Sequence, residues 1–170
     1  MFPQFIRPLR VLLQFFAAAG TPRQLALGFA LGMVVGLVPK GNLTAVVLVT
    51  ALLATRVNLG TGMVAAVVFS WVGMLADPLS HRIGLLFLTK QSLQPMWTYL
   101  YDLPVVPWTG LNNTVVLGSL LLGAWLFYPV YRLSEAGFAR GRPWLVERLK
   151  GRRIVQLLWG TEVAASWSAQ

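Results

Sequence analysis

A short polar stretch interrupts an otherwise apolar run and holds the residues best suited to chemistry. In GLVPKGNLTAVV, residues 36–47, the interruption consists of Pro39, Lys40, Gly41 and Asn42. Asn42 is a good N-cap, so a helix that begins after it would direct the positive end of its dipole toward the turn. Lys40 adds a full positive charge beside that helix end. Together these four residues predict a ligand site for an anionic group, such as the phosphate of a lipid headgroup.

Two other interpretations of this stretch were weighed. Gly36 and Gly41 have the spacing of a nucleotide-binding loop, but Asn42 and Leu43 stand where that loop requires lysine and Ser/Thr. A nucleotide loop is therefore excluded. The second alternative is that the turn reaches a membrane surface, where Lys40 extends into water and binds no specific ligand.

A second group of polar residues comprises Arg56, Asn58, Asp77, His81 and Arg82. The group contains no nucleophile with an evident base, and one histidine with one carboxylate falls short of a zinc site. A purely structural interpretation of Asp77 is that Asp77 and Pro78 form a turn that ends a helix. We therefore predict no catalytic residue, no metal and no cofactor, and we expect that the protein is not an enzyme.

The composition indicates the solvent in which these residues lie. Of the 170 residues 56% are hydrophobic and 11% are charged, whereas soluble domains carry about a quarter charged residues. This balance predicts an integral membrane protein. Because the chain has no cysteine, disulfides and thiolate metal sites are excluded. The excess of 14 Lys and Arg over 5 Asp and Glu suggests contact with anionic membrane lipids rather than nucleic acid.

The apolar runs on either side of Lys40 are too short to cross a bilayer individually. Residues 25–38 and 43–54 would form helices of about 21 and 18 Å, against a hydrocarbon core of about 30 Å. One continuous helix would place Lys40 near the bilayer centre at a cost of about 2.5–3.5 kcal/mol. We therefore predict a re-entrant helical hairpin over residues 22–56, with its turn at residues 39–42. Its first helix is expected to begin after Thr21, because Pro22 suits the first helical position and Gln24 can complete a capping box with Thr21.

The rest of the chain fits an all-α membrane protein with two crossings. Asp77 and Pro78 are expected to end the first crossing. The aromatic residues Trp97, Tyr99, Tyr101 and Trp108 suggest a belt at the membrane interface. The predicted segments are an interfacial amphipathic helix (1–19), a membrane domain (20–134) and a basic cytoplasmic tail with an amphipathic helix (135–170). Within the membrane domain we expect the hairpin (22–56), a transmembrane helix (57–76), an interfacial segment (77–110) and a second transmembrane helix (111–133).

Small residues and charge placement predict packing and orientation. Gly28, Gly32 and Gly36 form a stripe that allows close helix packing, and a turn at membrane depth needs shelter for its backbone. We therefore expect a homo-oligomer or a complex with a larger membrane-associated protein. Basic residues gather near both termini, which predicts a multi-pass protein with both termini in the cytoplasm.

The run TPRQLALGFALGMVVGLVPKGNLTAVVLVTALLATRVN, residues 21–58, resembles the bacterial membrane-protein family catalogued as domain of unknown function 2062. The resemblance rests on a pattern of small residues and prolines followed by an Arg-x-Asn ending, namely Pro22, Ala26, Gly28, Ala30, Gly32, Gly36, Pro39, Gly41, Arg56 and Asn58. It implies a location in the bacterial inner membrane, and a subgroup of short members often encoded beside a larger partner. Other members often carry Asn-Pro where this chain has Asp77-Pro78.

The sequence thus leaves two functions in competition. The first is an accessory or anchoring subunit of a membrane complex, acting in envelope lipid handling. The alternative is a small transporter or lipid translocase that binds an anionic headgroup at the tip of the hairpin.

Overall fold

The computed structural model describes residues 20–150, with the side chains of residues 20–141, and every regular element in that part is helical. The elements are α2 (Pro22–Leu37), α3 (Leu43–Ala54), α4 (Leu59–Leu88), α5 (Gln94–Tyr101) and α6 (Thr114–Lys150), with the 3-10 turns η1 (Gln91–Leu93) and η2 (Val106–Thr109). By length and composition, α4 and the part Thr114–Gly141 of α6 could cross a membrane. The predicted all-α fold with two such helices is confirmed. The interfacial helix expected over residues 1–19 lies outside the described residues.

The polar residues before α2 start that helix as the sequence predicts. The Thr21 hydroxyl accepts a hydrogen bond from the Gln24 backbone N–H at 3.3 Å, and the Gln24 side chain accepts one from the Thr21 N–H at 3.0 Å. Pro22 occupies the first turn, where its missing N–H costs no hydrogen bond. This capping box, together with Pro22, determines where the helix begins.

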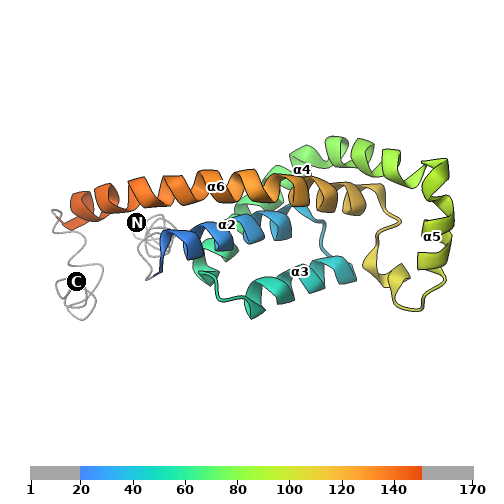
Figure 1. Cartoon of the computed structure of the whole chain (residues 1–170), viewed down its shortest axis with the longest axis horizontal. Helices are drawn as coiled ribbons and strands as arrows, with labels where there is room; N and C mark the ends of the chain where they lie inside the picture. The colour runs from blue at the N-terminus through green and yellow to red at the C-terminus, as the bar shows by residue number, and fades with distance from the viewer. Residues whose placement is uncertain (1–19, 151–170) are drawn as a thin grey trace, which may run out of the picture.

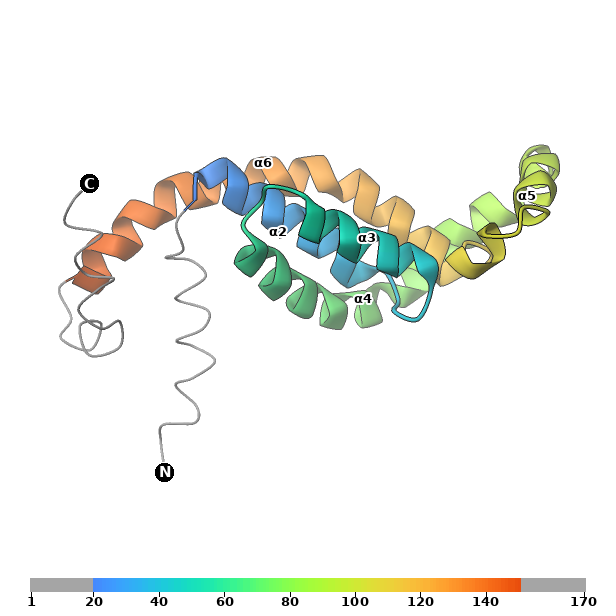
Figure 2. The ribbon, with the colours of Figure 1, turned by 90° about the horizontal axis from the view of Figure 1, so that it is seen from below.

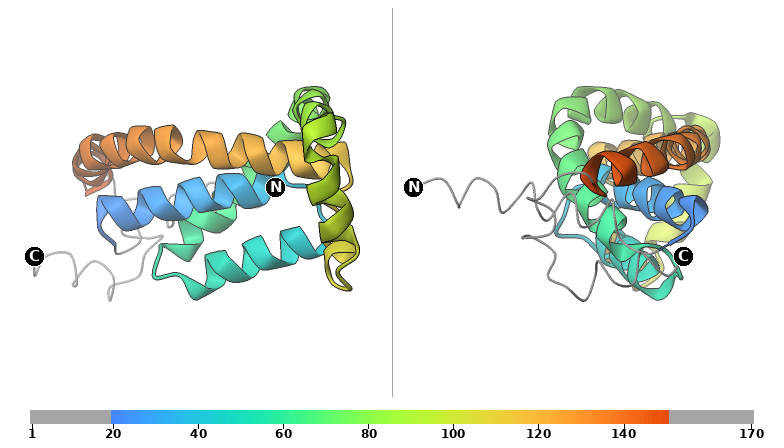
Figure 3. Two further views of the ribbon diagram at one scale, coloured as in Figure 1. Left: turned by 45° about the vertical axis from the view of Figure 1, so that its right-hand side comes forward. Right: turned by 90° about the vertical axis from the view of Figure 1, so that its left-hand side faces the viewer.

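Helix α2 lies at the centre of the bundle, with α3, α4 and α6 around it (Figures 1 and 2). Ten of its sixteen residues are buried, whereas only Ala45 and Leu52 are buried in α3. α2 and α4 run in the same direction, and α3 and α6 run back (Figure 1). α5 lies across the end of the bundle at which α2 finishes (Figure 3). By length alone, α2 and α3 are shorter than the helices that could cross a membrane. The central helix of the bundle is therefore one of these two short helices.

The glycine stripe of α2 packs against α4 of the same chain. A Cβ on Gly32 would overlap the Gly62 carbonyl and approach Ala65 at 2.9 Å. A Cβ on Gly28 would meet the Asn58 backbone, and one on Gly36 would lie 2.6 Å from the Phe69 Cβ. The stripe therefore brings two backbones together inside one molecule. The sequence suggests that this stripe packs against another chain. Because α4 already covers the stripe, a partner would have to bind a different surface.

Helix α4 continues through Pro78, although the sequence predicts that the helix ends at Asp77 and Pro78. That prediction is wrong. A proline inside a helix removes one hydrogen bond and costs about 3 kcal/mol, but the residues beyond it are held by α6. A Cβ on Gly84 would overlap the Thr114 carbonyl, and one on Gly118 would overlap the Ser80 carbonyl. This close contact stabilises the second half of α4, which curves away from the first half (Figures 1 and 3).

Helix α6 also runs further than the sequence predicts. The second crossing was expected to stop at residue 133 and a separate helix to begin in the tail, yet one helix extends from Thr114 to Lys150. The continuation carries Glu135 and Phe138, which contact α2 through Arg23 and Phe29. These contacts hold the helical turns beyond residue 133 against the bundle and stabilise the continuation of the helix.

The tight contact between α2 and α4 makes a stability prediction. Gly32→Leu should destabilise the folded chain by at least about 1–3 kcal/mol, because the larger side chain would force α2 and α4 apart. Gly137→Leu is the matched control, since a Cβ at Gly137 meets no atom within 4 Å and leucine favours helix. Thermal unfolding of the purified proteins in detergent would measure both effects. Equal melting temperatures for the two variants would contradict the packing described above.

Candidate functional site

Lys40 binds the end of the helix that precedes it. Its ammonium Nζ donates hydrogen bonds to the carbonyl oxygens of Val35 at 2.7 Å, Gly36 at 3.1 Å and Val38 at 2.8 Å. An ammonium has three N–H donors, so all of them are occupied. The last carbonyls of a helix have no partner within the helix, and they form the negative end of its dipole. Lys40 therefore caps α2 with a side-chain charge.

The remaining polar groups of the turn are also satisfied from within. Asn42 accepts a hydrogen bond from the Ala45 N–H at 2.8 Å and so caps α3 as predicted, while its side-chain amide donates to the Pro39 carbonyl at 2.8 Å. Gly41 has φ +95°, a conformation that residues with a side chain rarely adopt. Although the Lys40 side chain is exposed, partial desolvation of its ammonium against the end of α2 lowers the pKa of Lys40 from its ordinary value. The turn is thus a self-contained structure in which one exposed lysine carries the charge.

The turn is held from outside by the segment after α5. The Thr44 hydroxyl donates to the Thr109 carbonyl at 2.8 Å, and a Cβ on Gly110 would lie 3.2 Å from the Asn42 Cβ. Sequence reasoning missed these contacts because Thr109 and Gly110 lie far along the chain and carry no recognisable motif. They place η2 directly against the tip of the hairpin.

Tyr101 is a second residue in this region that sequence reasoning placed only in an aromatic belt. Its hydroxyl is buried, and within the described part of the chain it has no partner in hydrogen-bond geometry. The Asn112 backbone and the Thr109 hydroxyl approach it without meeting that geometry. Burial raises the pKa of the Tyr101 phenol, and these two neighbours oppose the rise.

The second group of polar residues does not form a single cluster. Asn58 caps α4 by accepting a hydrogen bond from the Thr61 N–H at 2.9 Å, and its own N–H donates to the Gln24 carbonyl at 3.2 Å. Asp77 follows nineteen residues later in the same helix, a distance of about 28 Å along its axis. Arg56 and Asn58 therefore lie just before α4, far from Asp77, His81 and Arg82 in its second half. The sequence analysis treats these five residues as one group, but the length of α4 separates them into two.

His81 links α4 to the start of α6. Its Nδ1 lies 2.6 Å from the Thr114 hydroxyl oxygen, and the two groups share a hydrogen bond. Asp77 and Arg82 make no ion pair among residues 20–141, whose ion pairs are both formed by Glu135. In the same part of the chain, no three His, Cys, Asp or Glu side chains lie close enough to hold a metal ion.

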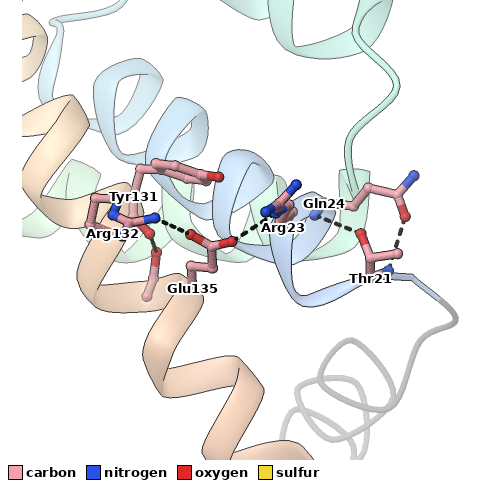
Figure 4. Close-up of polar contacts among 7 residues, drawn as sticks. Thr21, Arg23, Gln24, Tyr131, Arg132 and Glu135 are labelled. Carbon is pink, nitrogen blue, oxygen red and sulfur yellow. Dashed lines mark hydrogen bonds and ion pairs between the residues drawn. The ribbon is translucent and has the colours of Figure 1, made fainter.

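Glu135 forms a charged contact at the other end of the bundle that the sequence did not reveal. Its two carboxylate oxygens bind Arg23 Nε at 3.1 Å and Arg132 Nη1 at 3.0 Å (Figure 4). The Glu135 side chain is only 17% exposed, while both arginine side chains face solvent. Arg23 and Glu135 are 112 residues apart, so nothing local in the sequence pairs them. The contact fastens the start of α2 to α6.

Comparison with known proteins identifies the family. Residues 7–143 match the model of a family described as "Uncharacterized protein conserved in bacteria (DUF2062)". The chain belongs to this family. A relative described as an uncharacterized protein of Treponema pallidum (strain Nichols) is 28% identical over 153 residues, covering 90% of this chain and 94% of the relative. The resemblance drawn from residues 21–58 is therefore confirmed. No solved structure gives a significant match.

The capping role of Lys40 can be tested by removing its donors. Lys40→Met keeps most of the unbranched side chain but leaves three carbonyls without their partner, so it should lower the free energy of unfolding by about 1 kcal/mol. Lys90→Met removes an exposed lysine for which no such contact exists among the described residues and serves as the control. Thermal unfolding in the same detergent would compare the two. A melting temperature unchanged in Lys40→Met would show that the cap contributes nothing.

Proposed function

We propose that this protein is a small integral membrane protein that acts as an accessory or anchoring subunit of a membrane complex. The proposal is supported by the observation that the polar side chains of the protein bind its own backbone. Lys40, Asn42 and Asn58 bind helix ends of the chain itself, and Thr61 donates to the Leu25 carbonyl at 3.2 Å. Polar side chains inside the bundle thus maintain its structure, while its exterior is apolar.

The apolar exterior is the surface available to a bilayer or to another membrane protein. On α4, Trp71 is 71% exposed and Leu75 is 84% exposed, and on α3, Val46 and Val47 are each 59% exposed. Monomeric soluble proteins rarely expose large contiguous apolar areas. In a membrane these faces would contact acyl chains and the helices of a partner.

The charges support an orientation in the bacterial inner membrane. One end of the bundle is where α2 begins and α3 and α6 run out (Figure 1). By their positions in the sequence, seven basic residues among the described residues 20–150 belong to that end, namely Arg23, Arg56, Arg132, Arg140, Arg142, Arg148 and Lys150, whereas three, Lys40, Arg82 and Lys90, belong toward the other end. Cytoplasmic segments carry such an excess of basic residues. We therefore place that end, with both termini, in the cytoplasm, and the end with Lys40 and α5 on the opposite side.

The partner is proposed to be a second copy or a larger membrane-associated protein, and the complex to act in envelope lipid handling. The support for a partner is the small buried area of α3, which leaves most of that helix uncovered by its own chain. The uncovered face of such a helix can pack against a helix from another subunit.

Photo-crosslinking would test the proposed complex. A photoreactive amino acid placed at Val47 of α3 or at Leu75 of α4 should crosslink to protein in intact membranes, giving a species heavier than the 18.7 kDa chain. Native mass spectrometry of the unmodified protein from mild detergent should give an assembly of more than one polypeptide. Lipid adducts alone at both positions, together with a monomeric particle, would refute an anchoring role.

The alternative function is a small transporter or lipid translocase that binds an anionic headgroup at the tip of the hairpin. It is supported by the exposed position of Lys40 next to the N-terminus of α3, where the charge and the helix dipole add. Against it stands the use of all three Lys40 donors by α2. A headgroup would have to compete with three carbonyl oxygens, so the accessory role is preferred.

Lipid retention distinguishes the two functions. If the tip binds an anionic headgroup, Lys40→Gln should lose roughly ten- to a hundredfold in affinity for it, because a charge-assisted contact is worth about 1.5–3 kcal/mol. Lys40→Arg should retain much of the bound lipid, and Lys90→Gln is the control. Native mass spectrometry with defined anionic lipids would measure retention. Equal retention by Lys40→Gln and Lys90→Gln would remove the transporter or translocase alternative.

A further inference from the structure

Helix α2 and α6 lie side by side over nearly the whole thickness of a bilayer. At one end Arg23 pairs with Glu135; in the middle a Cβ on Gly123 would lie 3.3 Å from Val34; at the other end Val38 and Val116 share a buried cluster. The stretch of α6 between residues 116 and 135 is about 28 Å long, close to the 30 Å of a hydrocarbon core. The facing residues 23–38 of α2 span about 22 Å, and the Arg23 side chain and the turn at residues 39–42 extend beyond the two ends of that stretch. A membrane crossed by this part of α6 is therefore crossed by α2 as well.

Helix α4 gives the same register independently. Gly28, near the start of α2, faces Asn58 at the start of α4, and Leu37, at the end of α2, lies against Gly73. The two helices begin at the same level and run together. Gly73 is the fifteenth of the thirty residues of α4, so α2 runs beside the first half of that helix and ends opposite Gly73, four residues before Asp77, where the apolar part of α4 ends.

Helix α3 and the linker after it return over the same depth. Ala45, near the start of α3, belongs to the buried cluster of Val38 and Val116, and Leu52, near its end, contacts Gly62 in the first turn of α4. The four residues from Thr55 to Asn58, which make three residue steps, can add at most about 10 Å to the 18 Å of the helix. The hairpin thus begins and ends at the level of Asn58.

The tip of the hairpin joins a surface with the composition of a membrane interface. η2 is bound to it through Thr44 and Thr109, and α5 lies across the same end of the bundle (Figure 3). Around the tip, Tyr99 is 69% exposed, Val105 58% and Trp108 77%. Tyrosine and tryptophan concentrate at the headgroup level of membranes, where one end of the side chain is apolar and the other wet.

We propose that the hairpin of α2 and α3 crosses the entire apolar layer, and that its tip, with α5 and η2, forms one surface seated in the headgroup region of the far leaflet. The partner of this surface is the layer of phosphate-bearing lipid headgroups. The inference rests on the proposed membrane location, and it replaces the half-depth hairpin expected from sequence. At this level Lys40 caps α2 while its charge faces phosphates, so it avoids the cost of a lysine in the hydrocarbon core.

The lysines of the unmodified protein provide the test, because the sequence contains only Lys40, Lys90 and Lys150. A membrane-impermeant amine reagent would be applied to spheroplasts and to inside-out vesicles, and each modified lysine identified by mass spectrometry. Lys40 should be modified from the same side as Lys90, and Lys150 from the other side. A Lys40→Cys variant probed with an impermeant maleimide repeats the measurement with a group that is not bound to carbonyls.

The outcomes separate this inference from the proposed orientation. Protection of position 40 from both sides, in lysine and cysteine forms, would restore the half-depth hairpin and overturn the inference. Modification of position 40 together with Lys150 would also overturn it. If Lys40 and Lys90 react together but only in inside-out vesicles, the full crossing stands and the proposed cytoplasmic termini are wrong.

Contact with headgroups is tested by spin labels at Tyr99→Cys and Trp108→Cys in lipid vesicles. Both should show the intermediate accessibility to oxygen and to a water-soluble nickel complex that marks the interface. Leu75→Cys, in the exposed apolar face of α4, should favour oxygen, and Arg56→Cys should favour the nickel complex. Labels at 99 and 108 that match Arg56→Cys would place the surface in water, and protection from both reagents would mean that a protein covers it; either result overturns the proposed contact with lipid.

Discussion

The fold depends on the close approach of the α2 and α4 backbones. Gly28, Gly32 and Gly36 on α2 leave no room for a side chain toward α4, and Gly62 and Ala65 keep the facing surface small. In a bilayer, burial of apolar groups gives little driving force between helices, so tight packing of this kind must supply the attraction. α2 is consequently held at the centre of the bundle, and the positions of α3 and α6 follow from it.

A helix buried at the centre of a bundle must have its backbone ends satisfied within the protein. At its start α2 uses the Thr21 and Gln24 capping box, and at its end it uses Lys40. The lysine that first suggested an anion site thus has a structural task that accounts for its three donors. The same reasoning explains Asn42 and Asn58, each of which caps the helix that follows it. Much of the unusual polarity of this chain is needed to begin and end helices in an apolar environment.

The contact between α4 and α6, like that between α2 and α4, depends on glycines that allow the two backbones to approach closely. Its consequence is different. Gly84 and Gly118 bring those backbones together beyond Pro78, and the His81–Thr114 hydrogen bond lies in the same region. This contact carries α4 past a proline that would otherwise end it, so the chain continues into α5 and η2 at the far end. Those elements then close over the hairpin tip through Thr109 and Gly110. The surface at the far end is thus a product of helix packing, although its residues look like an ordinary loop.

The sequence by itself determined those features that depend on interactions between residues close together in the chain. The apolar character, the starts of α2 and α3, the turn at residues 39–42 and the family follow from composition, from capping residues three positions apart and from a glycine pattern of period four. Only the tertiary structure decided that the stripe faces α4, that Glu135 binds Arg23 from 112 residues away, that α4 passes Pro78 and that Arg56 lies far from Asp77. The physical reason is the range of the interactions: a cap binds a backbone group within one helical turn, whereas helix partners are selected by the shapes of surfaces that no local pattern describes.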